Sequence, residues 1–137
     1  MGVILDSSIL ISAERQGSSA RQVFASLLPQ LGNIEIAISV ITLAELAHGL
    51  ERANTPQRKL TRQRFIHELL LALPIYPVTN AIALRAGQID GYCEARGVRV
   101  PLGDLLIGVT ALELNYAVAT RNARHFQLIP ALSVLSL

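Results

Sequence analysis

The chain has 137 residues, a length that suits a single domain with its own hydrophobic core. Hydrophobic residues make up 51% of it and charged residues 16%, which excludes an intrinsically disordered protein, and no apolar run is long enough to span a membrane. The net charge of +2 is too small to identify a nucleic-acid-binding protein by itself. Eleven of the twelve basic residues are arginine, however, and arginine suits phosphate and carboxylate partners.

The N-terminus and the cysteine content favour a cytoplasmic protein. Asp6 lies where a secretory signal peptide would be apolar, and no basic residue precedes it. Cys93 is the only cysteine, so no internal disulfide can form, as expected in a reducing compartment. We therefore expect a cytoplasmic chain with no membrane partner.

Short apolar runs alternate with longer amphipathic segments along the whole chain. In the first half we expect a strand at Val3–Leu5, helices at Ile9–Glu14 and at Ser18–Leu31 (capped by Ser18 or Ser19), a strand at Ile34–Ile38, a helix at Thr42–Ala53 and another from Pro56 to about Leu73. In the second half we expect a strand at Ile75–Val78, a helix at Thr79–Arg96, a helix opening at Asp104, a strand at Tyr116–Thr120, a turn at Asn122–Phe126 and a strand at Leu132–Leu135.

This alternation predicts an α/β fold: a central, mostly parallel sheet of four or five strands with helices on both faces, formed by one domain over residues 1–137. Parallel sheets gather their functional groups at the carboxyl ends of the strands. Asp6 follows the first strand, Thr120 ends the strand at Tyr116–Thr120 and Asn122 lies just after it, so their side chains are expected at one edge of the sheet.

Three of the ten acidic residues lie inside the most apolar segments of the chain, namely V-I-L-D (Asp6), T-L-A-E-L-A (Glu45) and P-L-G-D-L-L-I (Asp104). Each has a structural explanation when taken singly: Asp6 and Asp104 as helix caps, and Glu45 as the acid of a capping box that starts at Thr42. Three carboxylates at one edge would repel each other strongly, however, and a divalent cation relieves that repulsion. The sequence therefore predicts an acidic metal site.

A carboxylate-held Mg²⁺ or Mn²⁺ indicates metal-assisted hydrolysis of a phosphodiester, in which the ion lowers the pKa of a bound water and one acid orients or deprotonates that water. The pattern argues against zinc, because Cys93 is single and no H-E-x-x-H spacing joins the three histidines, His48, His67 and His125.

Four motifs then resemble one known family in order and spacing over nearly the full length. They are V-I-L-D-S-S-I-L-I, S-V-I-T-L-A-E-L-A-H-G-L, G-D-L-L-I-G-V-T-A-L and A-V-A-T-R-N-A-R-H-F. Together they resemble the PIN-domain ribonucleases, and most closely the VapC toxins of bacterial toxin–antitoxin modules. The resemblance implies a PIN-like three-layer sandwich.

The resemblance also implies a Mg²⁺- or Mn²⁺-dependent endoribonuclease whose catalytic residues are Asp6, Glu45, Asp104 and Asn122. Asp6 and Asp104 would bind the metal, with Glu45 as a further candidate ligand, and Ser7, Ser8 and Thr120 would support the acids or a water. Where many relatives have an aspartate before the phenylalanine, this chain has His125, and the amide of Asn122 brings no charge. These departures leave open whether one or two ions bind.

The implied partners are an RNA substrate, a small antitoxin that blocks the acidic pocket with a basic side chain, and a second copy of the chain in a homodimer. Arg121 and Arg124 flank Asn122, and contact with substrate phosphate and a simple surface position are both open for them. Residues 52–64 hold five of the twelve basic groups, but no aromatic residue is interleaved before Phe65, so a solvated helix face is the favoured interpretation.

The run I-H-E-L-L-L-A-L that follows Phe65 could be an interface, although an ordinary core-facing helix is favoured. Two alternative functions stay open beside the nuclease. One is a phosphohydrolase of another class that uses Asp6 as a nucleophile. The other is a catalytically weak PIN-like module that binds RNA or protein, which the neutral Asn122 makes plausible.

Overall fold

Five parallel strands form one central sheet in the computed structural model, which describes residues 1–137. The strands are β1 (Gly2–Leu5), β2 (Glu35–Ser39), β3 (Ile75–Tyr76), β4 (Ala117–Thr120) and β5 (Val134–Ser136). The helices are α1 (Ser7–Arg15), α2 (Ala20–Leu31), α3 (Val40–Arg52), α4 (Pro56–Ala72), α5 (Asn80–Glu94), α6 (Leu102–Leu114) and the short 3₁₀ helix η1 (Phe126–Leu128).

The strand order is β3-β2-β1-β4-β5, with Val3 of β1 opposite Ile36 on one side and Ala117 on the other. Later strands are therefore added on both sides of β1, and the direction in which strands are added reverses between β1 and β4. In open parallel sheets, ligands bind in the crevice outside the carboxyl ends of the strands at such a reversal. Asp6 directly follows β1, and Thr120 ends β4.

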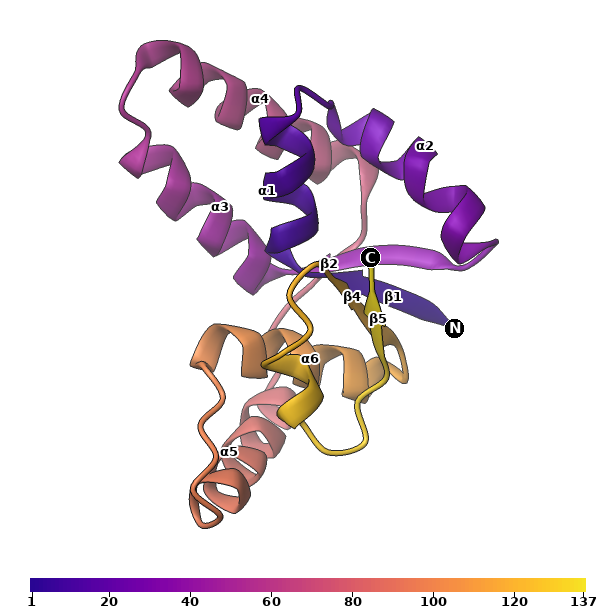
Figure 1. Ribbon diagram of the computed structural model, residues 1–137, viewed down its shortest axis with the longest axis vertical. Coiled ribbons are helices and arrows are strands. Elements are labelled where there is room, and N and C mark those ends of the chain that lie inside the picture. Colours follow the sequence, from indigo (N-terminus) through magenta and orange to yellow (C-terminus); the bar gives the residue numbers. More distant parts are fainter.

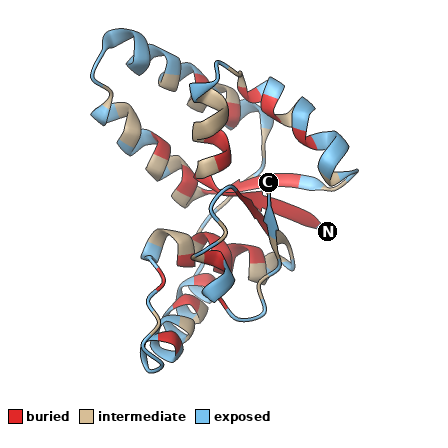
Figure 2. Ribbon diagram, in the orientation of Figure 1, coloured by how far each residue is buried: buried red, intermediate tan, exposed pale blue.

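Helices cover both faces of the sheet, which makes the predicted three-layer sandwich (Figure 1). Successive residues of a strand point to opposite faces. Val3 and Leu5 accordingly pack in one core with α1 to α4, and Ile4 packs in a second core with α5, α6 and η1. Figure 2 shows the buried strands between these two helical layers. None of the helices combines the length and the apolarity that crossing a bilayer requires.

Two helix starts decide between the explanations open for the acids. Helix α3 begins at Val40, because the Ser39 hydroxyl accepts a hydrogen bond from the Ile41 amide at 3.1 Å. Glu45 therefore belongs to no capping box, and the start expected at Thr42 is wrong. Helix α6 begins at Leu102 after Pro101, which places Asp104 within the first turn and not at the cap.

Other boundaries differ by one or two residues. Helix α1 begins at Ser7, two residues before the expected start, and Asp6 occupies its cap position without making a side-chain capping bond. Strand β3 has only two residues, since prolines bound it on both sides and cannot donate to a sheet. Ser19, one of the two expected caps, forms a full capping box with Gln22.

Gly108 of α6 offers a test of this packing. An added Cβ would lie 2.5 Å from Ile129 Cδ1 and 3.1 Å from Leu132 Cδ2, so Gly108→Ala should destabilise the protein by about 1–3 kcal/mol despite its better helix propensity. Gly87 of α5 is the matched control: it is exposed and has no atom near such a Cβ, so Gly87→Ala should stabilise by about 0.5–1 kcal/mol. Urea unfolding of both variants measures the two effects, and equal shifts would contradict the packing described.

Candidate active site

The carboxylate of Asp6 is held in one orientation at the carboxyl end of β1. Its Oδ2 accepts hydrogen bonds from Ser8 Oγ at 2.7 Å and from Thr120 Oγ1 at 2.9 Å. Asp6 is 5% exposed, and its backbone amide is fixed by the Ala119 carbonyl at 2.9 Å. Because both side-chain bonds go to Oδ2, Oδ1 is left to contact another group.

The same two hydroxyls also bind the loop that follows β4. Ser8 Oγ accepts from the Arg121 amide at 3.1 Å, and Thr120 Oγ1 accepts from the Asn122 amide at 2.9 Å. Ser8 and Thr120 therefore orient Asp6 and secure the neighbouring loop together. The Asn122 side chain is exposed and makes no hydrogen bond within the protein.

Glu45 reaches the same edge from α3. An ideal Cβ at Gly103 would lie 3.6 Å from Glu45 Oε2, which places this carboxylate against the first turn of α6, beside Asp104. Partial burial raises the pKa of Glu45 above its ordinary value, the nearby Ser7 hydroxyl acts in the opposite direction, and the charges of Asp6 and Asp104 raise it further. Its Oε1 is buried and has no hydrogen-bond partner.

Asp104 is paired with His125. His125 Nδ1 lies 2.8 Å from Asp104 Oδ2, and the two side chains are 33% and 22% exposed. Partial burial raises the pKa of Asp104, the hydrogen bond from His125 lowers it, and the charge of Asp6 raises it. The histidine thus fixes one oxygen of Asp104 and tempers the negative charge of the edge.

The structure brings the three acids close enough that the charges of Asp6 and Asp104 raise the pKa of Glu45 and the charge of Asp6 raises the pKa of Asp104. It does not bring three acidic, histidine or cysteine side chains into a closed group that could hold a metal as they stand. The donors are nevertheless those that Mg²⁺ and Mn²⁺ prefer, and both ions take further ligands from water and phosphate. The unpartnered Oε1 of Glu45 and the free Oδ1 of Asp6 fit this donor chemistry.

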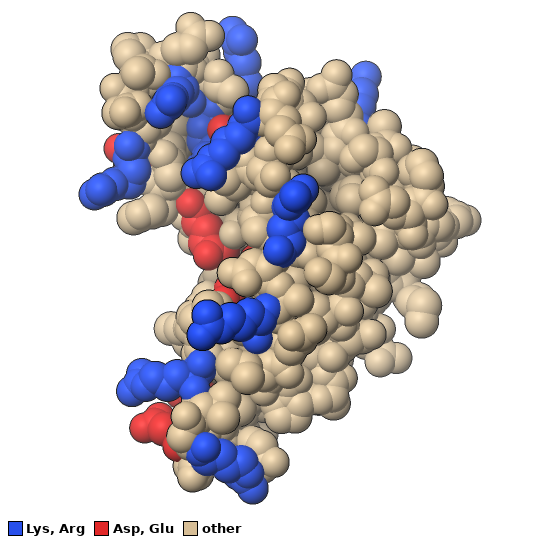
Figure 3. Space-filling model, viewed as in Figure 1, with Lys and Arg blue, Asp and Glu red and all other residues tan.

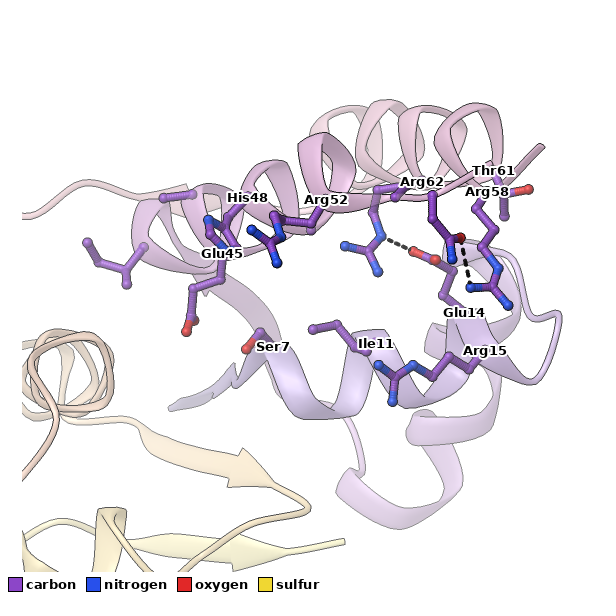
Figure 4. A pocket seen from close by; sticks show the side chains of 15 residues that line it. Ser7, Ile11, Glu14, Arg15, Glu45, His48, Arg52, Arg58, Thr61 and Arg62 are labelled. Atoms are coloured by element: carbon purple, nitrogen blue, oxygen red, sulfur yellow. Dashed lines mark hydrogen bonds and ion pairs between the residues drawn. The ribbon is translucent and has the colours of Figure 1, made fainter. Parts of the chain in front are cut away.

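A cavity of about 1100 Å³ opens from this acidic edge and runs between α1, α3 and α4. Figure 4 shows Glu45 and Ser7 at one end of it, Arg15 and Arg58 at the other, and Arg52 between them. In the space-filling view, acidic side chains lie in a hollow with basic side chains above and below it (Figure 3).

This cavity corrects the interpretation of residues 52–64. Lys59 and Arg64 are exposed and lie outside it, as a solvated helix face predicts, but Arg52, Arg58 and Arg62 line it together with Glu45. Arg15 and Glu14 also line the cavity, which was not expected from the sequence. The signal that could have found Arg52 is its spacing of seven residues from Glu45, which places both on one face of α3.

The family model that describes the PIN domain matches residues 3–131 of this chain. The chain belongs to the PIN domain family. It is 32% identical over 140 residues to a ribonuclease VapC from Rickettsia bellii, and the match covers 99% of this chain and 96% of the relative. The resemblance drawn from the four motifs is confirmed.

Two solved PIN-fold structures are also similar to this PIN domain. One is VapBC2 from Rickettsia felis bound to a DNA fragment from their promoter, with a TM-score of 0.83, 27% identity and coverage of 100% of this chain and 99% of that chain. The other is VapBC-5 from Mycobacterium tuberculosis, a member of the VapBC family of toxin–antitoxin systems. It has a TM-score of 0.75 at 24% identity, covers 99% of this chain and 98% of that chain, and supports the fold alone.

The raised pKa of Glu45 generates a stability prediction for the metal-free protein. A carboxyl whose pKa is higher in the folded state than its ordinary 4.5 contributes stability below that value and loses it as pH rises through the folded-state pKa. Glu45→Gln removes the charge, so at pH 7 in EDTA we expect a melting temperature a few degrees above that of the wild type, with the gain limited by solvent screening of a half-exposed group.

The gain should shrink below pH 4.5, where Glu45 is protonated in both states. Glu51→Gln is the matched control, since it makes the same change at an exposed position on the same helix and should leave the melting temperature nearly unchanged. A Glu45→Gln variant that is less stable than the wild type at neutral pH would show that this carboxylate is not under electrostatic strain.

Proposed function

We propose that this PIN domain is a metal-dependent endoribonuclease, the toxin of a toxin–antitoxin pair, and that Asp6, Glu45, Asp104 and Asn122 carry the reaction. The observation that carries the proposal is the meeting of three carboxylates at the point where the strand order reverses, with two of them half-buried and raised in pKa. Glu45 also lines the cavity, and an acid with a raised pKa in a cleft is a candidate for a functional site. The name of the Rickettsia bellii relative, a ribonuclease, supports RNA as the substrate.

Mg²⁺ or Mn²⁺ is the cofactor that fits these residues. Asp6 and Asp104 would hold it, with Glu45 as a further candidate ligand through its unpartnered Oε1. A bound ion supplies neutralisation of phosphate charge and a lowered pKa for water. It would also balance the negative charge that now raises the pKa values of Glu45 and Asp104.

The side chains divide the remaining work. Ser8 and Thr120 hold Asp6 in a fixed orientation, and His125 does the same for Asp104. Glu45 is the acid best suited to accept a proton from the attacking water, because its raised pKa brings it nearer the working pH. The exposed amide of Asn122 can orient water or phosphate through its carbonyl oxygen and adds no charge.

The remaining partners belong to the same proposal. A small antitoxin would bind this chain, in keeping with its likeness to VapBC2 from Rickettsia felis, and it would block the acidic pocket with a basic side chain, as the resemblance to VapC toxins implies. A homodimer has support in α4, where Phe65 and Leu69 face the core as favoured but Leu70 and Leu71 are 51% and 77% exposed. A monomeric mass in light scattering at high concentration would contradict the dimer. The buried, unpaired Cys93 is compatible with a cytoplasmic location.

Asp104→Asn tests the nuclease directly. The amide keeps the shape of the side chain and an oxygen for His125 but removes the charge, so cleavage of an RNA panel with Mn²⁺ should fall at least about a hundredfold with the fold retained. Asp90→Asn makes the same change at an exposed site on α5 and should cleave like the wild type. Gel analysis of end-labelled RNA with circular dichroism of each variant gives both readouts.

Three results would contradict the proposal or redirect it. Binding of RNA without cleavage by the wild type would favour the binding module. An acid-stable phosphoryl group trapped on Asp6 would favour the phosphohydrolase that uses this residue as a nucleophile. Equal cleavage by Asp104→Asn and the wild type would remove the acidic edge from the chemistry altogether.

A further inference from the structure

The cavity beside the acids is lined by one stripe from each of three helices. On α3, Glu45, His48 and Arg52 face it at positions i, i+3 and i+7, and on α4 Arg58 and Arg62 face it at i and i+4. Helix α1 adds a third stripe that runs from Ser7 through Ile11 and Glu14 to Arg15. The groove therefore has an acidic end at the candidate active site and a basic end away from it (Figure 4).

The basic side chains in this groove are of two kinds. Arg62 is committed to the fold, since its guanidinium pairs with Glu14, donates to the Leu46 carbonyl at 3.1 Å and occupies the space that a side chain at Gly49 would need. It therefore joins α4 to α1 and α3.

Arg15, Arg52 and Arg58 are the second kind, and we call them the free arginines. All three are exposed, and none takes part in an ion pair. Arg58 only donates to the neutral Asn54 at 3.2 Å, which orients it without cancelling its charge. Three uncompensated guanidinium groups along one groove form a site for an anionic ligand with repeated charges.

The groove suits a polyanionic strand better than a partner helix. Most of the residues that line it are polar, and its four hydrophobic residues are divided between α1 (Ile11) and α3 with the residue that follows it (Ile41, Ala44 and Ala53). They do not form the continuous apolar face that a helix partner requires. The groove also leads straight to Glu45. Arg52 is seven residues from Glu45 on α3, a rise of about 10 Å, so it would meet a phosphate close to the one being attacked, and Arg15 and Arg58 would meet phosphates farther along the groove.

We infer that the free arginines are the phosphate track of the substrate: a single RNA strand lies in the groove between α1, α3 and α4, and Arg15, Arg52 and Arg58 bind the phosphates next to the scissile one. This inference rests on the proposed function for its substrate class. It assigns the binding of substrate phosphates to the free arginines. It assigns no such role to Arg121 and Arg124, which lie in the loop after β4.

Binding and cleavage are tested separately. RNA binding is measured by fluorescence anisotropy with a labelled single-stranded RNA of mixed sequence, in the Asp104→Asn background so that no cleavage occurs. Adding Arg52→Ala and Arg58→Ala should weaken binding about tenfold or more and reduce the slope of log K against log salt by about 1.4, since each lost phosphate contact contributes about 0.7 for single strands.

The matched control replaces Lys59 and Arg64, which lie in the same segment of the chain but outside the groove, by alanine. It lowers the net charge by the same amount and should change binding less than twofold. Replacing Arg52 and Arg58 by lysine should restore part of the affinity, because lysine still binds phosphate as a point charge. In the active background, Arg52→Ala with Arg58→Ala should raise KM and change kcat little.

Each outcome bears on one claim. Equal loss in the groove and control variants would reduce the effect to net charge and overturn the track, as would unchanged binding in both. A glutamate-rich peptide could instead bind the wild type and lose this binding in the Arg52→Ala, Arg58→Ala variant, while RNA binding stays unaffected by the same changes. That result would assign the groove to a protein partner. RNA bound through the free arginines but not cut by the wild type would leave the track standing and contradict the proposed ribonuclease.

Discussion

Crowded negative charge at one edge of a parallel sheet is the constraint on which this structure depends. The neighbouring strands β1 and β4 end side by side, so Asp6 and Thr120 must leave the sheet together, and α3 and α6 add Glu45 and Asp104 to the same edge. Burial and mutual repulsion raise the pKa values of Glu45 and Asp104, which costs stability that the two hydrophobic cores offset. Such an arrangement is poor for folding and well suited to hold a cation and activate water.

The residues around that edge are of two kinds: some hold the acids or the helices in place, and others are exposed along the groove. Ser8, Thr120 and His125 each hold one carboxylate oxygen in place, and Arg62 braces the helices on which the groove is built. Beyond them the free arginines carry positive charge away from the acids along the groove. Under the proposed function, the molecule separates the acidic charge that would take part in the reaction from the basic charge that would bind the RNA.

Local patterns in the sequence were sufficient for the architecture and for the family. Strand and helix alternation predicted the parallel three-layer fold, and four motifs predicted the family, because both depend on residues close together in the chain. The two capping explanations were decided only by the observed starts of α3 and α6, each of which lies two residues before the expected start. For α3 the cause is Ser39, which caps the helix. Contacts between distant residues were beyond sequence reasoning: Asp104 meets His125 across 21 positions and Glu14 meets Arg62 across 48, and only the folded helices show which arginines are free.

The central claim is that carboxylates from separate parts of the chain form one cation site. A crystal structure of the protein grown with Mn²⁺, with the anomalous signal of manganese recorded, addresses it most directly. The account predicts an anomalous peak bound by the carboxylates of Asp6 and Asp104, with Glu45 within reach of the ion or of a water bound to it. Manganese found only at surface sites elsewhere, with Asp6 and Asp104 ligating nothing, would contradict it.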